Sequence, residues 1–283
     1  MLADKPSGIP SARAVAMVKR LLPKKTKVGH TGTLDPLASG LLILMIGRAT
    51  RLSRYVTDME KSYTATARFR ATSTTLDAEG EIVELDAKVP SEEEVRAALP
   101  NFTGKITQLP PMASAVKVGG ERLYNLHRKG LEVERKEREI TVHSFTLVSF
   151  DQPAKTATFD ISCSSGTYVR SLVSDLAESL KTGAYLTTLH RSSVGRFSAD
   201  NAVSPEEFDE QSICNRIIPP TEILAHLPVV EVGGEVARGV CSGRAFRVSG
   251  IEGGFRVESE GELLAVYSGE DGVAKPEVVL CAG

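Results

Sequence analysis

The segment GHTGTLDPLASG, residues 29–40, is rich in turn-forming residues and is followed directly by the longest uninterrupted apolar run of the chain, Leu41–Ile46. So many turn formers are typical of neither a helix nor a strand, and they predict a structured loop. Six apolar residues suit a strand buried on both faces, but a membrane crossing needs roughly 20. The sequence therefore predicts a buried sheet with an irregular loop beside it and no membrane span.

Apolar periodicity predicts the main helices. Ser11 is expected to cap a helix that ends before Pro23, and a second stripe predicts a helix over 167–180. Capping-box patterns predict two short helices, one at Ser91 with Glu94 and one after Ser204 with Glu207. The apolar positions of the first two helices are Ala14, Val15, Val18, Leu21 and Leu22, and then Val169, Leu172, Val173, Leu176 and Leu180.

Alternation predicts a half-buried strand over Tyr63–Arg70, and further strands are expected over 140–142, 146–150 and 157–163. After Pro219 and Pro220 the sequence changes to short β-type pieces separated by glycines, which is typical of a small β-barrel or sandwich. These pieces are 229–232, 246–248, 255–257 and 263–267. We therefore place a domain boundary near residue 220, between parts 1–220 and 221–283.

The net charge of −2 conceals a gradient along the chain. Residues 1–60 contain ten Lys or Arg and four Asp or Glu, a net charge of +6, whereas residues 204–283 carry −8. The basic end is suited to face phosphate, although an uneven solvated surface would look the same. Four cysteines without a CxxC pattern favour buried reduced thiols over zinc or a disulfide. Met1–Leu22 lacks the apolar core of a secretory signal, so a cytoplasmic protein is expected.

Asp35 is the only acid between Asp4 and Asp58. Nearby cations would lower its pKa and keep it ionised, as a nucleophile or base requires. Alternatively, Asp35 and Thr33 simply cap a turn. The glycines do not suit a phosphate-binding loop, because no Gly-Lys-Ser/Thr follows them.

The motif GHTGTLDPLASGLL resembles the catalytic motif of the bacterial tRNA pseudouridine-55 synthases, and other family segments follow in the same order. Leu76, Asp77 and Gly80 resemble the end of the family's T-D-T-x-D-x-x-G, with Thr74 at the position of its first Asp. The remaining segments are Asp4 to Gly8, Lys61 with Tyr63, 108–130, 163–172 and Leu189 with Arg191. The resemblance covers about residues 2–200, and the β-rich tail lies where these enzymes carry a PUA-like domain.

The resemblance implies an α+β fold, with a mixed and largely antiparallel sheet flanked by helices and a small C-terminal β-barrel. It implies that Asp35 is the catalytic carboxylate, that Arg170 pairs with it, and that Tyr63 stacks on the target base. His30 would fill the space that the flipped base leaves. The other residues expected to bind RNA or shape the pocket are Lys5, Pro6, Gly32, Thr33, Leu34, Lys61, Lys117, Tyr124 and Leu189. Without the resemblance, Tyr63 reads as a core aromatic and His30 as an ordinary histidine.

The implied reaction converts a uridine of the tRNA T loop, at position 55, to pseudouridine without a cofactor or a metal, and a monomer is expected. Whether Asp35 forms a covalent bond or opens a glycal route stays undecided. The basic insertion over about 108–138 suits an arm on an RNA backbone, or else a solvated hairpin neutralised by its own acids. It also favours the stand-alone enzymes over their guide-RNA-dependent relatives. The alternative function is an RNA-binding or tRNA-folding protein without turnover.

Overall fold

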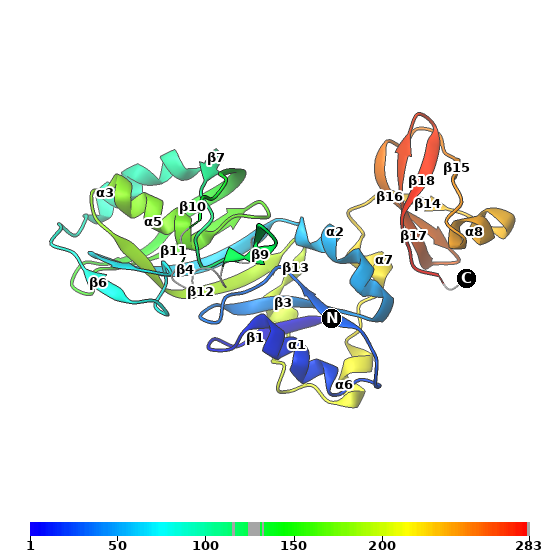
Figure 1. Cartoon of the computed structure of the whole chain (residues 1–283), viewed down its shortest axis with the longest axis horizontal. Coiled ribbons are helices and arrows are strands. Elements are labelled where there is room, and N and C mark those ends of the chain that lie inside the picture. The colour runs from blue at the N-terminus through cyan, green and yellow to red at the C-terminus, as the bar shows by residue number, and fades with distance from the viewer. Residues whose placement is uncertain (115–116, 124–130, 132, 282–283) are drawn as a thin grey trace.

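The computed structural model describes residues 1–114, 117–123, 131 and 133–281. A nine-stranded sheet forms its centre, with the spatial order β1-β3-β12-β4-β11-β10-β7, and with β2 beside β3 and β13 beside β12 (Figure 1). β12 pairs with β3 in parallel, and the other neighbours are antiparallel. The strands are β1 Leu2–Lys5, β2 Val28–Thr31, β3 Ser39–Ile46, β4 Lys61–Phe69, β7 Gly104–Gln108, β10 Arg138–Asp151, β11 Thr156–Cys163, β12 Ala184–Val194 and β13 Phe197–Ser198.

The helices lie against this sheet and along its connections. α5 buries Val169, Leu172, Val173 and Leu176 in the main core, and β4 buries Tyr63, Ala65, Ala67 and Phe69 in the same core. In the described parts of the chain the helices are α1 Ser11–Lys19, α2 Ser53–Thr57, α3 Glu92–Ala98, α5 Val169–Ser179, α6 Glu210–Asn215 and α7 Pro220–Ile223, with α8 Gly234–Cys241 in the C-terminal unit. Short 3-10 helices are η1 Gly47–Leu52, η2 Leu99–Phe102 and η3 Ala199–Asn201.

A second sheet of five strands, in the order β14-β16-β17-β18-β15, forms the C-terminal unit and carries α8 (Figure 1). Its strands are β14 Val229–Glu231, β15 Phe246–Arg247, β16 Gly253–Ser259, β17 Glu262–Glu270 and β18 Val273–Val279. Two hairpins complete the strands, β5 Ala71–Ser73 with β6 Ile82–Glu84, and β8 Lys117–Val118 with β9 Glu121–Arg122. Among the described residues, no helix is long and apolar enough to cross a membrane.

The apolar run predicted as a doubly buried strand is β3. Leu42 and Leu44 point into the main core, whereas Leu41, Ile43 and Met45 join a second core that also contains Leu280 and other residues of the C-terminal unit. Side chains alternate between the faces of a strand, so a strand between two cores has to be apolar at every position. β3 is thereby packed on both faces, so the loop that precedes it ends at a rigid strand.

Several expectations about local structure were wrong. β2 extends through Gly29, His30 and Thr31 because these residues pair with β3, so the loop is shorter than residues 29–40. The strands expected over 140–142 and 146–150 are one bulged strand, β10. α1 ends at Lys19 rather than at Pro23, and Ser11 lies inside the helix with Pro10 at the cap.

Two further corrections concern capping and cysteines. The capping box at Ser91 and Glu94 is present, but no helix starts at Ser204, where the chain makes a turn. The nearby helix α6 is capped by Asp209 instead. Cys241 and Cys281 form a disulfide, contrary to the expectation of reduced thiols, because α8 and the chain after β18 meet with a Cα separation of 5.4 Å. A sequence separation of 40 hides that contact from inspection of the sequence.

Candidate active site

Asp35 lies in the loop between β2 and β3, and the loop is held by backbone contacts. The Ser11 hydroxyl donates to the Leu34 carbonyl and accepts from the Leu34 N–H, both at 2.9 Å. The Ala38 N–H donates to the Asp35 carbonyl at 3.1 Å, which closes a turn. Leu34 is buried, whereas the Asp35 side chain keeps 35% of its surface exposed. A fixed backbone therefore presents a carboxylate that a substrate can reach.

Gly32 begins this loop, Gly40 lies just beyond its other end in β3, and Arg191 of β12 contacts both sides. Both glycines have a positive φ, +70° and +100°. A Cβ on Gly40 would lie 2.4 Å from the Arg191 carbonyl oxygen, so only glycine fits there. The buried Arg191 guanidinium donates to the carbonyls of Gly32 (2.9 Å) and Leu41 (2.7 Å). Arg191 thus ties the loop to the sheet.

Arg170, in the first turn of α5, is the charged partner of Asp35. Its Nη2 lies 2.9 Å from Asp35 Oδ2, and its Nη1 lies 3.4 Å from Asp77 Oδ2. The guanidinium also donates to the carbonyls of Thr75 and Ala113, each at 2.7 Å. Arg170 is 4% exposed and Asp77 is 2% exposed. Four oxygens from three segments of the chain therefore fix one guanidinium against the loop.

Burial raises the pKa of Asp35 above its ordinary value, and the negative charge of Asp77 raises it further. The charges of Arg170 and Lys5 lower it, but they do not outweigh burial. The expectation that the pKa of Asp35 would be lowered was wrong, because it took the nearby cations into account but not the loss of water around the buried carboxyl. A raised pKa makes the carboxylate a stronger base, while the ion pair with Arg170 favours its charged form.

Two buried lysines, Lys5 and Lys61, support the same region. Lys5 Nζ donates to the carbonyls of Pro6 (2.9 Å), Ile9 (2.7 Å) and Pro36 (3.3 Å), so it joins the first strand to the loop. Lys61 Nζ donates to the carbonyl of Thr57, the last residue of α2, at 2.8 Å and to that of Met59 just after it at 2.6 Å. Desolvation by burial lowers the pKa of each lysine to about 8. Both side chains have internal acceptors, so they support the site from inside the protein.

Tyr63 lies on β4 opposite Arg191 of β12 and is 8% exposed. Burial raises the pKa of the Tyr63 hydroxyl. The charge of Arg191 opposes that rise, and the negative charge of Asp35 adds to it. Leu189 is buried on the same strand as Arg191. The structure therefore brings together the predicted residues Asp35, Arg170, Tyr63 and Leu189 in one region of the sheet.

The other predicted residues are spread around this region. Pro6 follows β1 and is half-buried, Thr33 is exposed in the loop, and half-buried His30 lies on β2 opposite Leu44. Lys117 belongs to β8, but the structure does not describe its side chain. Tyr124 lies outside the described residues.

From the sequence, no functional role was assigned to Asp77 and Arg191, and it was not predicted that Ser11 holds the loop. Asp77 and Arg191 lie in segments that resemble those of the family, and this resemblance was the sequence signal that could have identified them. Ser11 was interpreted as a helix cap. Among the described residues, no group of three or more His, Cys, Asp or Glu is arranged to hold a metal ion.

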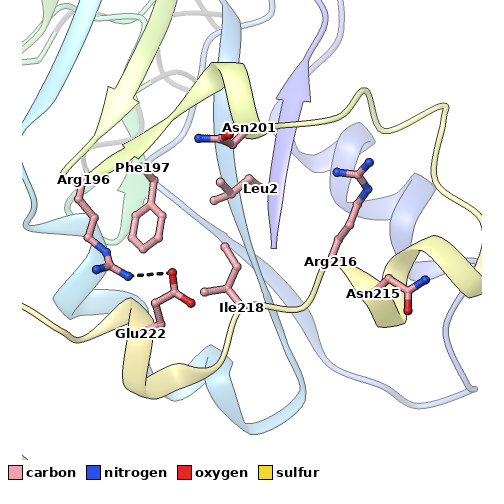
Figure 2. A pocket seen from close by; sticks show the side chains of 8 residues that line it. All are labelled: Leu2, Arg196, Phe197, Asn201, Asn215, Arg216, Ile218 and Glu222. Atoms are coloured by element: carbon pink, nitrogen blue, oxygen red, sulfur yellow. Dashed lines mark ion pairs between the residues drawn. The ribbon is translucent and has the colours of Figure 1, made fainter.

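A cavity of about 520 Å³ lies elsewhere, where β1, the β12–β13 turn, η3, α6 and α7 meet (Figure 2). An Arg196–Glu222 ion pair of 2.8 Å crosses one side of it. Its lining residues are Leu2, Arg196, Phe197, Asn201, Asn215, Arg216, Ile218 and Glu222. None of these lining residues belongs to the predicted site, so the candidate active site is placed around Asp35 from the contacts of Asp35 and Arg170 and not from the position of this cavity.

Comparison with known proteins identifies the family. The model of the TruB family pseudouridylate synthase N-terminal domain matches residues 19–169. A protein of Cupriavidus metallidurans named tRNA pseudouridine synthase B is 41% identical over 273 residues, 95% of this chain and 87% of the relative. Proteins of the same name from Burkholderia mallei and Clostridium kluyveri are each 40% identical, covering 100% and 85% of this chain and 97% and 82% of theirs.

Solved structures show the same fold. A Cbf5-Nop10-Gar1 complex matches with a TM-score of 0.74 at 23% identity, covering 99% of this chain and 84% of that chain. An H/ACA RNP bound to a substrate RNA containing 2′-deoxyuridine matches with a TM-score of 0.72 at 20% identity, covering 99% and 85%. These matches confirm the predicted α+β fold with a small C-terminal PUA-like unit. On the family model and the full-length relatives, the chain belongs to the TruB family of pseudouridylate synthases.

Proposed function

We propose that this protein isomerises a uridine of tRNA to pseudouridine, and that its target is position 55 in the T loop. The relatives that match the whole chain are named tRNA pseudouridine synthase B, which supports tRNA as the substrate. The observation that carries the assignment is Asp35, a reachable carboxylate paired with a buried arginine at 2.9 Å. The target uridine meets that carboxylate after leaving its stack, at a cost of a few kcal/mol.

The reaction breaks the bond from C1′ to N1 and forms one from C1′ to C5. The C5 proton is lost and N1 gains a proton, so the overall change needs no redox partner or group donor. We assign the central role to Asp35, either as a nucleophile or as the base that opens a glycal route. Arg170 keeps Asp35 charged and oriented, and Asp77 orients Arg170.

The remaining roles follow from position. Tyr63 stacks on the target base from β4, and Leu189 forms an apolar wall from β12. His30 fills the gap in the RNA left by the flipped nucleotide. Lys5, Pro6, Gly32, Thr33 and Leu34 shape the pocket, while Lys61 supports it. Lys117 and Tyr124 belong to the basic arm over about 108–138, which we propose contacts the RNA backbone.

We further propose that residues 1–220 form the catalytic domain and residues 221–283 a separate PUA-like RNA-binding domain. The five-stranded sheet β14–β18 with its own core supports this division. A monomer located in the cytoplasm, where its tRNA substrate would be found, completes the proposal.

The test is conversion of a T-arm hairpin that carries tritium at uridine C5, with EDTA and no added cofactor. Tritium release and pseudouridine in the digested RNA are expected. Asp35→Asn should still bind the hairpin but should lose about four orders of magnitude in rate. Asp86→Asn, a substitution at a fully exposed acid, is the matched control and should retain full activity.

A protein that binds tRNA without turnover is the competing function, and the basic N-terminal part of the chain favours it as well. The same assay separates the two. Tight hairpin binding without tritium release by the unmodified protein would replace the isomerase proposal with the binding one.

A further inference from the structure

Five cations cluster where α1 ends and the chain turns into β2. They are Lys19, Arg20, Lys24, Lys25 and Lys27, and we call them the basic corner. No Asp or Glu occurs between Lys5 and Leu34, and all five residues are exposed. Like charges held this close repel one another, so an anionic partner would relieve a cost that the free protein carries.

The described structure offers these cations no acidic partner. The Arg20 Nε–H donates to the Ala16 carbonyl at 3.3 Å, and none of the five forms an ion pair with a described residue. Cations near the last turn of a helix are favoured by its dipole, which explains Lys19 and Arg20. The dipole falls off within that turn, so it does not explain Lys24, Lys25 and Lys27.

The basic corner is connected to the active-site loop through two elements. α1 begins at Ser11, which is bonded to Leu34 beside Asp35, and runs for nine residues, or about 12 Å, before reaching Lys19. β2 begins directly after Lys27, contains His30 and ends at Thr31, where the loop begins. The end of α1 therefore lies about 12 Å along the helix from the Ser11–Leu34 contact beside Asp35, a length that is short beside an RNA stem.

We propose that the basic corner binds the phosphate backbone of the RNA at a distance from the target uridine. This rests on the proposed function, because it assumes an RNA placed at Asp35. Flexible lysines on an exposed turn are point charges that suit phosphates and read no sequence. Such contacts contribute affinity and salt dependence without touching the reacting atoms, so their loss should weaken binding and leave the chemical step intact.

Lys25 provides a sharp test because its backbone has a positive φ of 73°. A lysine is strained in that conformation and a glycine is not, so Lys25→Gly removes one charge while relieving strain. Lys181 is a matched control, since it is exposed, has a φ of 58°, lies beyond the end of α5 and has no other Lys or Arg between Arg170 and Arg191 in the sequence. Both glycine variants should keep the melting temperature of the parent protein.

The experiment compares the full-length parent, Lys25→Gly, Lys181→Gly and a triple variant with Lys24, Lys25 and Lys27 each changed to Gln. Dissociation constants for unmodified tRNA are measured over a range of salt concentrations. Losing three phosphate contacts should reduce the slope of log Kd against log salt by about 2 and weaken binding about tenfold or more near 0.1 M salt. Lys25→Gly should show a part of this effect, and Lys181→Gly none.

Unchanged slopes and affinities in the triple variant would overturn the proposal, and so would an equal loss in Lys181→Gly. Binding of the parent to anionic phospholipid vesicles that the triple variant loses, with an unchanged RNA slope, would assign the corner to a membrane surface instead. Tritium release at saturating RNA should be the same in the triple variant as in the parent. If the parent releases no tritium, the proposed function is wrong. The slope of log Kd against log salt in the triple variant still tests whether the basic corner binds RNA.

Discussion

Arg170 Nη2 lies 2.9 Å from Asp35 Oδ2, across 135 positions of sequence, and this pair joins the first turn of α5 to the loop before β3. The same guanidinium is held by Asp77 and by the carbonyls of Thr75 and Ala113. A planar fork satisfies four oxygens in a way that a point charge cannot. The position of the Asp35 carboxylate therefore depends on the shape of this side chain as well as on its charge.

Arg170→Lys is expected to lower kcat for the T-arm hairpin about a hundredfold or more, although the positive charge is retained. One ammonium group cannot reach Asp35, Asp77 and both carbonyls, so buried acceptors lose their donors. Each unsatisfied group costs about 1–3 kcal/mol, and the free energy of unfolding should fall by at least about 2 kcal/mol. Single-turnover kinetics and urea denaturation measure the two effects.

The control for this change is Arg196→Lys, which alters an exposed ion pair with Glu222. Exposed pairs contribute about 0–1 kcal/mol, so its activity and stability should stay near those of the parent. Normal turnover by Arg170→Lys would show that the fork is not needed to place Asp35.

Asp77→Asn should move the acid limb of the kcat profile to lower pH. The charge of Asp77 raises the pKa of Asp35, so removing it lowers that pKa, and the carboxylate stays ionised to a lower pH. Arg170 keeps its two carbonyl contacts, so the plateau should fall less than in Arg170→Lys. A pH series of single-turnover rates measures the limb, and an unmoved limb or one displaced to higher pH would contradict the assignment.

Gly40→Ala should lower the free energy of unfolding by about 3 kcal/mol or more. The new Cβ would meet the Arg191 backbone at 2.4 Å, and the φ of +100° adds strain. Gly104→Ala separates the two causes, since Gly104 has a φ of +91° and no atom within 4 Å of an added Cβ. It should cost only about 1–2 kcal/mol. Equal losses in the two variants would mean that contact with Arg191 contributes nothing.

The sequence predicts those elements in which buried and exposed residues follow a regular pattern along a few consecutive positions. The alternation of Tyr63, Ala65, Ala67 and Phe69 predicts the core face of β4, and the apolar run of β3 predicts its two buried faces. The pairing of Asp35 with Arg170 was predicted as well, but only through a resemblance to a family. Spacing alone would not bring together residues so distant along the chain.

What stayed hidden depends on contacts between distant segments. β2 forms from turn-type residues because β3 supplies hydrogen-bond partners, and tertiary pairing overrides local preference there. The pKa of Asp35 depends on how much water the fold displaces, which a count of neighbouring charges does not include. Asp77 approaches Arg170 only because the β5–β6 segment folds over the start of α5.

The Cys241–Cys281 disulfide predicts a definite thiol count. Protein purified in air and then denatured without reductant should react with two equivalents of a thiol reagent, at Cys163 and Cys214, and with four after reduction. Chain-entropy arguments give about 4 kcal/mol for closing a loop of this length, so Cys281→Ser should lower the free energy of unfolding by up to that amount in oxidised protein. Cys214→Ser, at an exposed free thiol, should have no such effect.

Loss of the disulfide should destabilise the junction between the two sheets, because Leu280 immediately precedes Cys281. Leu280 is buried in the core shared with β3, and its carbonyl accepts from Arg48 at 3.0 Å. Reduction should therefore make the amides of β18 exchange faster with solvent, while β4 and α5 keep their protection. Since a reducing cytoplasm would open the bond, hydrogen exchange on both redox forms is the decisive measurement. Four reactive thiols in the unreduced protein would show that Cys241 and Cys281 are not bonded to each other.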